Sequence, residues 1–285
     1  ITHDGGTITS GTGGIDGGAM TMSSGAPTAV VTVTGAGTWR LNLLTIQAGG
    51  TFTADAATIT MDGNWTNTAG TFNIGTSTVS IIGSTILTAA GSGSVNTFYN
   101  LTVTGDMTLT NNAGIANVLT ANTSATLNSG CGSGYFLNGA TATPFSRGAS
   151  VNVWTGIRFN TSVGATVPAG SYRGTNPALS FESAQTFTPN GNITTGDVAC
   201  AGSATDGSVT IAAGTYAKGT TTLTMTRGTL TMSGGDLTST SGDVTITGTA
   251  GGNVDISSAA SAIDFGSETW TISAGTWTNA STDAT

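Results

Sequence analysis

The sequence predicts an all-β protein that folds as a single-stranded parallel β-solenoid, and three observations support this fold class. Short stretches alternate apolar residues with threonine, glycines close these stretches at regular intervals, and the three-and-four spacing of a helix is absent. The 285 residues include 44 glycines and 60 threonines, and only 7% are charged, where an average soluble domain has about 25%. The alternation argues against disorder, because it gives each stretch one apolar face.

Residues 222–249 carry the clearest repeat, four consecutive blocks of seven: TLTMTRG, TLTMSGG, DLTSTSG and DVTITGT. The second and fourth places of each block point to one side of a strand, since side chains alternate with a period of two. We expect these inward residues to be Leu223, Met225, Leu230, Met232, Leu237, Ser239, Val244 and Ile246. Gly228, Gly235 and Gly242 end the first three blocks, and we expect them to supply the positive φ of tight corners.

Three seven-residue sides make one turn of roughly 21 residues, within the 20–50 residues typical of solenoid repeats. Each turn then pairs through its backbone with its neighbours, about 4.8 Å away. The corners are too short for the crossover helices of an ordinary parallel sheet. We therefore expect a β-helix of about 20 residues per turn, right-handed like other parallel crossovers, with about 13 turns in the chain.

The same pairs recur on both sides of this segment. C-terminally they are Val254 and Ile256, Ile263 and Phe265, and Trp270 and Ile272; N-terminally they are Met20 and Met22, Val31 and Val33, Leu41 and Leu43, Ile59 and Met61, Val79 and Ile81, Leu101 and Val103, and Met107 and Leu109. The phase shifts from Leu43 to Leu44 and from Ile81 to Ile82, which predicts a corner or bulge at each place. An Ala-Gly-Thr-aromatic motif recurs at 36–39, 69–72, 213–216 and 274–277.

The repeat is regular over 1–130 and again over 191–285, and weaker over 131–190. The middle segment holds four of the five prolines and three of the five arginines. We interpret it as a less regular part of the solenoid or an insertion, and strand-like pairing resumes at Leu179 and Phe181. Continuity of the solenoid is favoured over a separate domain.

The charge balance excludes several partners. The net charge is −8 and only six residues are basic, which leaves no positive footprint for nucleic acid. No apolar run approaches the roughly 20 residues of a membrane-spanning helix, so no membrane insertion is expected.

The chain shows no arrangement typical of catalysis. It has no Ser-His-Asp set, no CxxC and no phosphate loop, and His3 is its only histidine. Several acids neighbour glycine at expected corners, among them Asp62, Asp106, Asp236 and Asp243, where turn chemistry explains them. Stacking of repeats could bring Asp236 and Asp255 together as a general acid and base, but no repeated signal supports that role. We expect no enzyme, no cofactor and no metal.

The aromatic and threonine residues each allow two interpretations. Tryptophans such as Trp39 and Trp154 could stack on sugars, although core packing is the stronger explanation. Outward Thr-x-Thr ladders could bind ice if they formed one flat side; the high β propensity of threonine explains them more simply.

Two sets of residues are candidates for covalent modification. Six Asn-x-Ser/Thr sequons are candidate glycosylation sites, at Asn64, Asn100, Asn122, Asn160, Asn192 and Asn279. Cys131 and Cys200 are either a disulfide or two unpaired buried thiols, and their spacing does not choose between these states.

Residues 63–83, GNWTNTAGTFNIGTSTVSIIG, and 97–114, TFYNLTVTGDMTLTNNAG, resemble a unit of large secreted bacterial surface proteins. These are proteins of the filamentous-haemagglutinin and autotransporter-adhesin type, with predicted parallel β-helices. The resemblance implies a secreted or cell-surface location and brings no catalytic residue.

Both ends of the sequence carry the repeat pattern, so we expect either a piece of a longer chain or subunits that stack end to end. The leading hypothesis is a non-enzymatic structural protein, a subunit of an extracellular filament, fibre or sheath whose main partner is itself. The alternatives are a cell-surface adhesin stalk or glycan-binding module, with glycans as partners, and an ice-binding solenoid.

Overall fold

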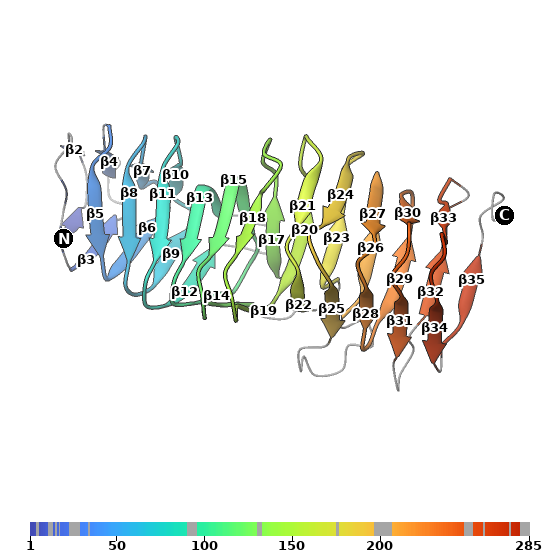
Figure 1. The fold of residues 1–285 in the computed structure, drawn as a ribbon. Helices are drawn as coiled ribbons and strands as arrows, with labels where there is room; N and C mark the ends of the chain where they lie inside the picture. Colours follow the sequence, from blue (N-terminus) through green and yellow to red (C-terminus); the bar gives the residue numbers. More distant parts are fainter. Residues whose placement is uncertain are drawn as a thin grey trace. The chain divides into compact units, whose positions relative to one another are not determined.

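The computed structural model describes residues 1–3, 6–10, 14, 16, 18–22, 29–33, 35–89, 96–129, 133–174, 177–196, 207–247, 253–258, 260–273 and 275–279. The chain forms two compact units (Figure 1). Unit 1 is Ile1–Ser133 with Arg147–Val151, and unit 2 is Gly134–Ser146 with Asn152–Thr285. Every regular element of the described residues is a β-strand.

The strands of unit 1 lie in three parallel sheets, and we name the parts of these sheets within this unit A, B and C. Sheet A has the order β1 (Thr2–His3), β3 (Ala19–Met22), β6 (Leu43–Gln47), β9 (Trp65–Thr68), β12 (Ser84–Ala89), β14 (Asp106–Leu109) and β16 (Thr126–Ser129). Sheet B has β2 (Gly6–Ser10), β4 (Ala29–Val33), β7 (Thr51–Thr53) and β10 (Thr71–Asn73). Sheet C has β5 (Thr38–Leu41), β8 (Thr58–Met61), β11 (Thr78–Ile81), β13 (Asn96–Val103) and β15 (Ala113–Ala121).

The strands of unit 2 also lie in three parallel sheets, and we name the parts within this unit D, E and F. Sheet D has β19 (Asn152–Trp154), β22 (Gly170–Arg173), β25 (Ile193–Gly196), β28 (Leu223–Met225), β31 (Val244–Thr247) and β34 (Trp270–Ser273). Sheet E has β17 (Gly134–Leu137), β20 (Gly156–Phe159), β23 (Leu179–Phe181), β26 (Val209–Ile211), β29 (Thr229–Met232), β32 (Asn253–Ile256) and β35 (Trp277–Asn279). Sheet F has β21 (Ala165–Val167), β24 (Thr186–Pro189), β27 (Thr215–Gly219), β30 (Asp236–Ser239) and β33 (Ile263–Asp264). One further short strand is β18 (Phe145–Arg147).

The predicted fold class is confirmed: the chain is a parallel β-solenoid of about 11 turns with about 22 residues per turn. The four seven-residue blocks form β28, β29, β30 and β31, one strand per block. Leu223 pairs with Val244 in sheet D, so three blocks complete one coil. The number of residues between stacked positions varies along the chain: the backbone N–H of Thr222 donates to the side-chain oxygen of Asn192, 30 residues earlier.

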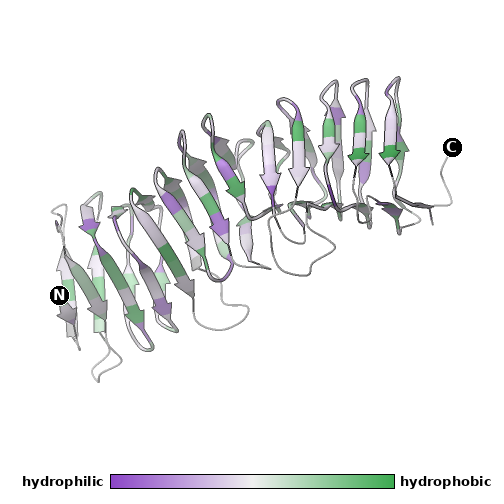
Figure 2. Ribbon diagram, turned by 90° about the horizontal axis from the view of Figure 1, so that it is seen from below, coloured by the Kyte–Doolittle hydropathy of each residue, from purple (hydrophilic) through white to green (hydrophobic). Residues whose placement is uncertain are grey.

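The core lies inside the coils as columns of inward side chains, one contributed by each turn. In sheet C the column runs Trp39, Ile59, Val79, Leu101 and Leu119, and all five are fully buried. All eight inward residues expected in 222–249 are buried. Hydrophobic and more polar residues follow one another as bands along the strands (Figure 2), because alternate side chains face the core and the outside.

Both predicted phase shifts are corners between strands. β5 ends at Leu41 and β6 begins at Leu43, and β11 ends at Ile81 before β12 begins at Ser84. The expectation that Leu43 faces inward was wrong: it is half-buried, and Leu44 is the fully buried residue. The corner restarts the alternation, so the inward phase of the next strand is set by the bend.

The corner glycines have two different roles, of which only one was predicted. Gly228 and Gly242 do adopt positive φ, at 96° and 87°. Gly63 has no positive φ, but a Cβ there would lie 1.9 Å from the carbonyl oxygen of Asn42 in the preceding coil. Gly235 also lacks positive φ, and its Cβ would meet Ile211 Cγ2 at 2.6 Å. At these two corners glycine is needed because neighbouring coils approach too closely for any side chain.

Candidate functional site

The last coil of the described residues, formed by β33, β34 and β35, is paired on one edge. These strands pair with β30, β31 and β32. No strand of the described residues pairs with their other edge. Unpaired N–H and C=O groups along such an edge are a template for a further strand.

This coil carries three aromatic side chains, Phe265, Trp270 and Trp277. We call these three residues the aromatic surface. The ring centroid of Phe265 lies 5.3 Å from that of Trp270 and 5.9 Å from that of Trp277, and the two indoles are 5.6 Å apart. Phe265 and Trp277 are each 40% exposed. In the preceding coil the residues paired with Trp270 and Trp277 are fully buried Val244 and Val254. Trp270 and Trp277 therefore occupy positions that belong to the core in the preceding coil, and no described strand pairs beyond them.

A buried polar network lies behind the aromatic surface. The indole Nε1 of Trp270 donates to Glu268 Oε1, and Glu268 Oε2 lies 3.2 Å from Lys218 Nζ. The ammonium also donates to the carbonyl oxygens of Thr221, at 2.8 Å, and Ser241, at 3.0 Å, and to that of Gly242. The network orients Trp270 and ties the last coil to the two before it.

The first coil of the described residues is also paired on one edge. β1 and β2 pair with β3 and β4. Ile1 is 58% exposed and Ile8, which pairs with buried Val31, is half-buried. Ile1 and Ile8 are thus the apolar side chains that this coil presents.

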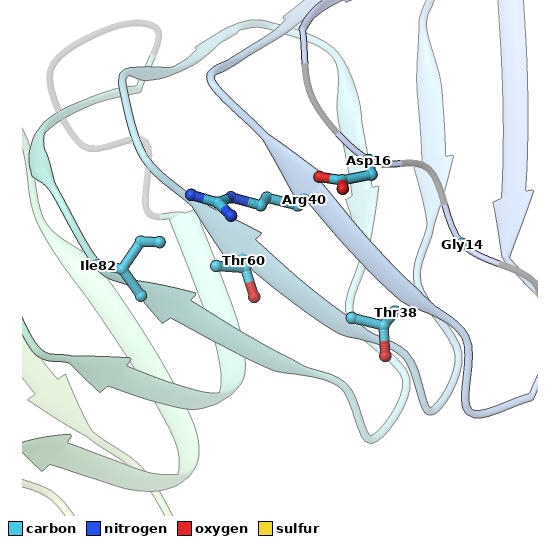
Figure 3. A pocket seen from close by; sticks show the side chains of 6 residues that line it. All are labelled: Gly14, Asp16, Thr38, Arg40, Thr60 and Ile82. Atoms are coloured by element: carbon cyan, nitrogen blue, oxygen red, sulfur yellow. The ribbon is translucent and has the colours of Figure 1, made fainter.

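A surface groove of about 520 Å³ lies on the outer face of sheet C (Figure 3). It is lined by Gly14, Asp16, Thr38, Arg40, Thr60 and Ile82. Arg40 and Asp62 form an ion pair at 3.2 Å with side chains 51% and 41% exposed, so it is a solvated pair. The groove can offer hydrogen bonds to a polar molecule, and its lining holds no paired carboxylates for acid–base work.

The six predicted glycosylation sites do not gather in one place, and their modification stays a prediction. Asn100 is half-buried, and the other five are exposed. Asn64 and Asn192 each accept a backbone N–H of the next coil, from Ile86 and Thr222, through their side-chain oxygens. Neither donates its Nδ2 to a described residue, so these two offer the nitrogen that a glycan would use. Cys131 and Cys200 lie outside the described residues.

Two of the four predicted corner carboxylates, Asp236 and Asp243, bond to backbone, but in neighbouring coils and not in their own turns. Asp236 Oδ1 accepts the N–H of Ala262 and Asp243 Oδ1 that of Thr269, each 26 residues away. Asp236 belongs to sheet F and Asp255 to sheet E, so the structure does not build an acid–base pair from them. The described residues contain no group of three His, Cys, Asp or Glu side chains able to hold a metal.

Burial distinguishes the core tryptophans from the exposed one, and position shows whether the outward threonines form one flat side. Trp39 and Trp65 are fully buried, so Trp39 is core and not a sugar platform, whereas Trp154 is 39% exposed. Outward threonines pair across coils in all three sheets of unit 1: Thr58 with Thr78 in sheet C, Thr45 with Thr66 in sheet A, and Thr51 with Thr71 in sheet B. A distribution over every side matches β propensity better than a single ice-binding plane.

Sequence reasoning missed the Lys218–Glu268 pair. The signal was present in the alternation of β27, where Lys218 occupies the inward phase two residues after buried Tyr216. Its partner lies 50 positions later, and only the stacking of coils brings the two together.

Comparisons with models of protein families, with curated proteins and with solved structures found no match. Among the described residues no helix could cross a bilayer. Of the resemblance noted in the sequence, the structure supports the parallel β-solenoid repeat architecture.

Proposed function

We propose that the chain is a non-enzymatic structural protein, a subunit of an extracellular filament, fibre or sheath in which copies stack coil upon coil. The observation that carries the proposal is the aromatic surface of the last described coil. It combines exposed core side chains with a strand edge open to further pairing.

Stacking is favoured by the parallel direction of every coil. The first coil of a second copy can add to the last coil in the same parallel sense, as each coil already adds to the one before it. Such a contact joins two different surfaces of the same chain and does not close on itself, which produces a filament. Buried aromatic side chains each remove about 150–250 Å² from water, and Ile1 and Ile8 offer an apolar counterpart.

The scarcity of charge supports the same function. Only 7% of the residues are charged, and Asp236 and Asp243 serve as corner caps. A fibre held by continuous backbone pairing needs few charges. A secreted or cell-surface location, in the manner of the bacterial surface proteins that the sequence resembles, belongs to this proposal.

The experiment is negative-stain electron microscopy and light scattering of the purified chain over a concentration series, with fibre diffraction of the concentrated material. We expect filaments that lengthen with concentration and show a reflection at about 4.8 Å along the axis. The Phe265→Ser/Trp277→Ser variant should shorten or abolish them. Ile86→Ser is the matched control, since Ile86 is 47% exposed on the side of a coil in β12. Monodisperse short particles at every concentration would overturn the proposal.

A further inference from the structure

Trp154 and Arg173 lie next to each other on the outer face of sheet D. Val153 of β19 pairs with Tyr172 of β22, and both are buried. The following residue in each strand, Trp154 or Arg173, therefore faces outward, on adjacent strands about 4.8 Å apart. Trp154 is 39% exposed and Arg173 is exposed.

Arg173 differs from the other five basic residues of the chain, all of which have partners. Arg40, Arg158 and Lys218 pair with Asp62, Glu182 and Glu268. Arg147 donates to the carbonyl oxygen of Val151, and Arg227 also has an interaction partner. Arg173 alone makes no hydrogen bond or ion pair with a described residue. In a chain of net charge −8, one exposed and unpaired guanidinium is a specific feature.

Trp154 is equally distinct among the five tryptophans. Trp39 and Trp65 are buried in the core, and Trp270 and Trp277 belong to the aromatic surface. Trp154 makes no ring contact with a described residue. Neither packing nor the open last coil explains its exposure.

A glycine and hydroxyl side chains lie on the described strands beside the pair. Arg173 pairs on its other side with Gly196 of β25, which has no side chain to cover the guanidinium. Beside this row runs a row of hydroxyls, in which Ser171 pairs with Thr194 and Thr194 with Thr224. The described residues of β19, β22, β25 and β28 include no carboxylate. Asp197, next to Gly196 in the chain, lies outside the described residues.

We propose that Trp154 and Arg173 form a subsite for an anionic polysaccharide containing uronic acid. The negative face of an indole attracts the C–H groups of a sugar ring, and stacking there buries the apolar side of both. The planar guanidinium binds a carboxylate through two parallel hydrogen bonds. The row of hydroxyls supplies partners for the sugar hydroxyls.

The inference is independent of filament assembly, because sheet D is a side of the solenoid. Repulsion from the acidic chain acts over a Debye length of only about 8 Å at physiological ionic strength, so it weakens the subsite without abolishing binding. We expect weak, salt-dependent binding at a single subsite.

The test titrates the full chain with unmethylated oligogalacturonate and, separately, with a neutral glucan oligomer of equal length, by calorimetry and tryptophan fluorescence. We expect oligogalacturonate to bind at least tenfold more tightly than the neutral oligomer. Trp154→Ala and Arg173→Gln should each weaken binding tenfold or more, and Arg173→Lys should fall between, since lysine lacks the planar fork.

Two control variants keep the result specific. Arg158→Gln removes an outer-face arginine that is already paired with Glu182 at 3.2 Å, and should leave binding unchanged. Trp277→Ala should impair assembly but not binding, which separates this inference from the proposed function. No binding by the wild-type chain, equal affinity for the neutral oligomer, or full affinity in Arg173→Gln would each overturn the assignment. Circular dichroism confirms that each variant keeps its strands.

Discussion

Lys218 Nζ and Glu268 Oε2 are 3.2 Å apart inside the core, and both side chains are fully buried although they belong to different coils. Lys218 lies in β27, and Ser241 and Gly242, whose carbonyl oxygens accept from its ammonium, follow β30 in the next coil. Glu268 lies one coil further, between β33 and β34. One side chain therefore joins three successive coils.

The first prediction concerns this ion pair. Lys218→Met should destabilise the last coils by about 3–5 kcal/mol, because it leaves the Glu268 carboxylate buried with the indole N–H of Trp270 as its hydrogen-bond donor. Glu268→Gln should cost less, since the ammonium keeps its three carbonyl acceptors. Hydrogen exchange of the β33 and β34 amides is the measurement. The double variant Lys218→Met/Glu268→Leu should restore most of the protection; unchanged exchange in Lys218→Met would show that the pair has no such role.

The second prediction concerns three buried tyrosines. The hydroxyls of Tyr135 and Tyr216 bond to no described residue, whereas Tyr172 donates to the carbonyl oxygen of Pro168 at 2.6 Å. An unsatisfied buried hydroxyl is unfavourable, so Tyr135→Phe and Tyr216→Phe should raise the free energy of unfolding by up to about 1 kcal/mol. Tyr172→Phe, the matched control, should lower it by about 1 kcal/mol. Urea titrations at pH 7 compare the three, and an equal loss in all of them would contradict the assignment.

The third prediction is an alkaline loss of stability from the same side chains. Burial raises the pKa of Tyr135 and of Tyr216 above the ordinary value of 10.0, and the nearby Tyr172 adds to the effect at Tyr216. Above pH 10 the unfolded chain releases these protons while the folded chain keeps them. The free energy of unfolding should therefore fall with rising pH, by about 1.4 kcal/mol per pH unit for each tyrosine.

Urea titrations between pH 8 and pH 12 measure this slope. The Tyr135→Phe/Tyr216→Phe variant should show a markedly shallower decline than the wild-type chain. An identical slope in both would mean that other groups cause the alkaline loss.

The fourth prediction concerns the close approach of coils at Gly63. An added Cβ would lie 1.9 Å from the carbonyl oxygen of Asn42, so Gly63→Ala must push two coils apart. We expect a loss of about 1–3 kcal/mol or more in thermal or chemical unfolding. Gly49→Asn is the control, since Gly49 has φ +80° and open space within 4 Å of the position that a Cβ would take, and asparagine tolerates that conformation. A loss in Gly63→Ala no larger than that in Gly49→Asn would contradict the assignment, because it would show that the close approach of the two coils excludes no side chain.

The fifth prediction compares a buried tryptophan, Trp39, with an exposed one, Trp154. Trp39→Ala should cost about 3–5 kcal/mol, as expected for a large core side chain. Trp154→Ala should change the free energy of unfolding by less than about 0.5 kcal/mol, because its side chain is on the surface. Acrylamide quenching is a second measurement: the Trp154→Ala variant should lose part of the quenchable fluorescence, and an unchanged quenchable fraction would contradict the exposure of this indole.

The faces of the strands could be predicted from the sequence because alternation is a local property. Leu223 and Met225 are inward whatever coil lies above them, since a period of two sets the side of each residue. The same reasoning failed at Leu43, where a corner intervenes and the phase restarts. It also failed for the role of Gly63, because the atom that excludes a side chain there belongs to another coil.

The residues of each candidate site come from different coils. The lengths of the corners decide which residues of neighbouring coils lie side by side. The side chains of Lys218 and Glu268 meet across two coil intervals, and Trp154 lies on the strand next to that of Arg173, so neither pair has a sequence spacing that could identify it.

By itself, the sequence determined that the chain is all β, that its strands have one apolar face, and that glycine-closed blocks of seven wind into parallel coils. These follow from periodicity and backbone preference, which act within a few residues. Only the tertiary structure decided the register between most coils, and with it the buried ion pair, the aromatic surface of the last described coil, and the exposed tryptophan beside an arginine that pairs with no described residue. The register between two coils depends on the lengths of the corners that join them, and outside the seven-residue blocks the sequence pattern does not fix these lengths.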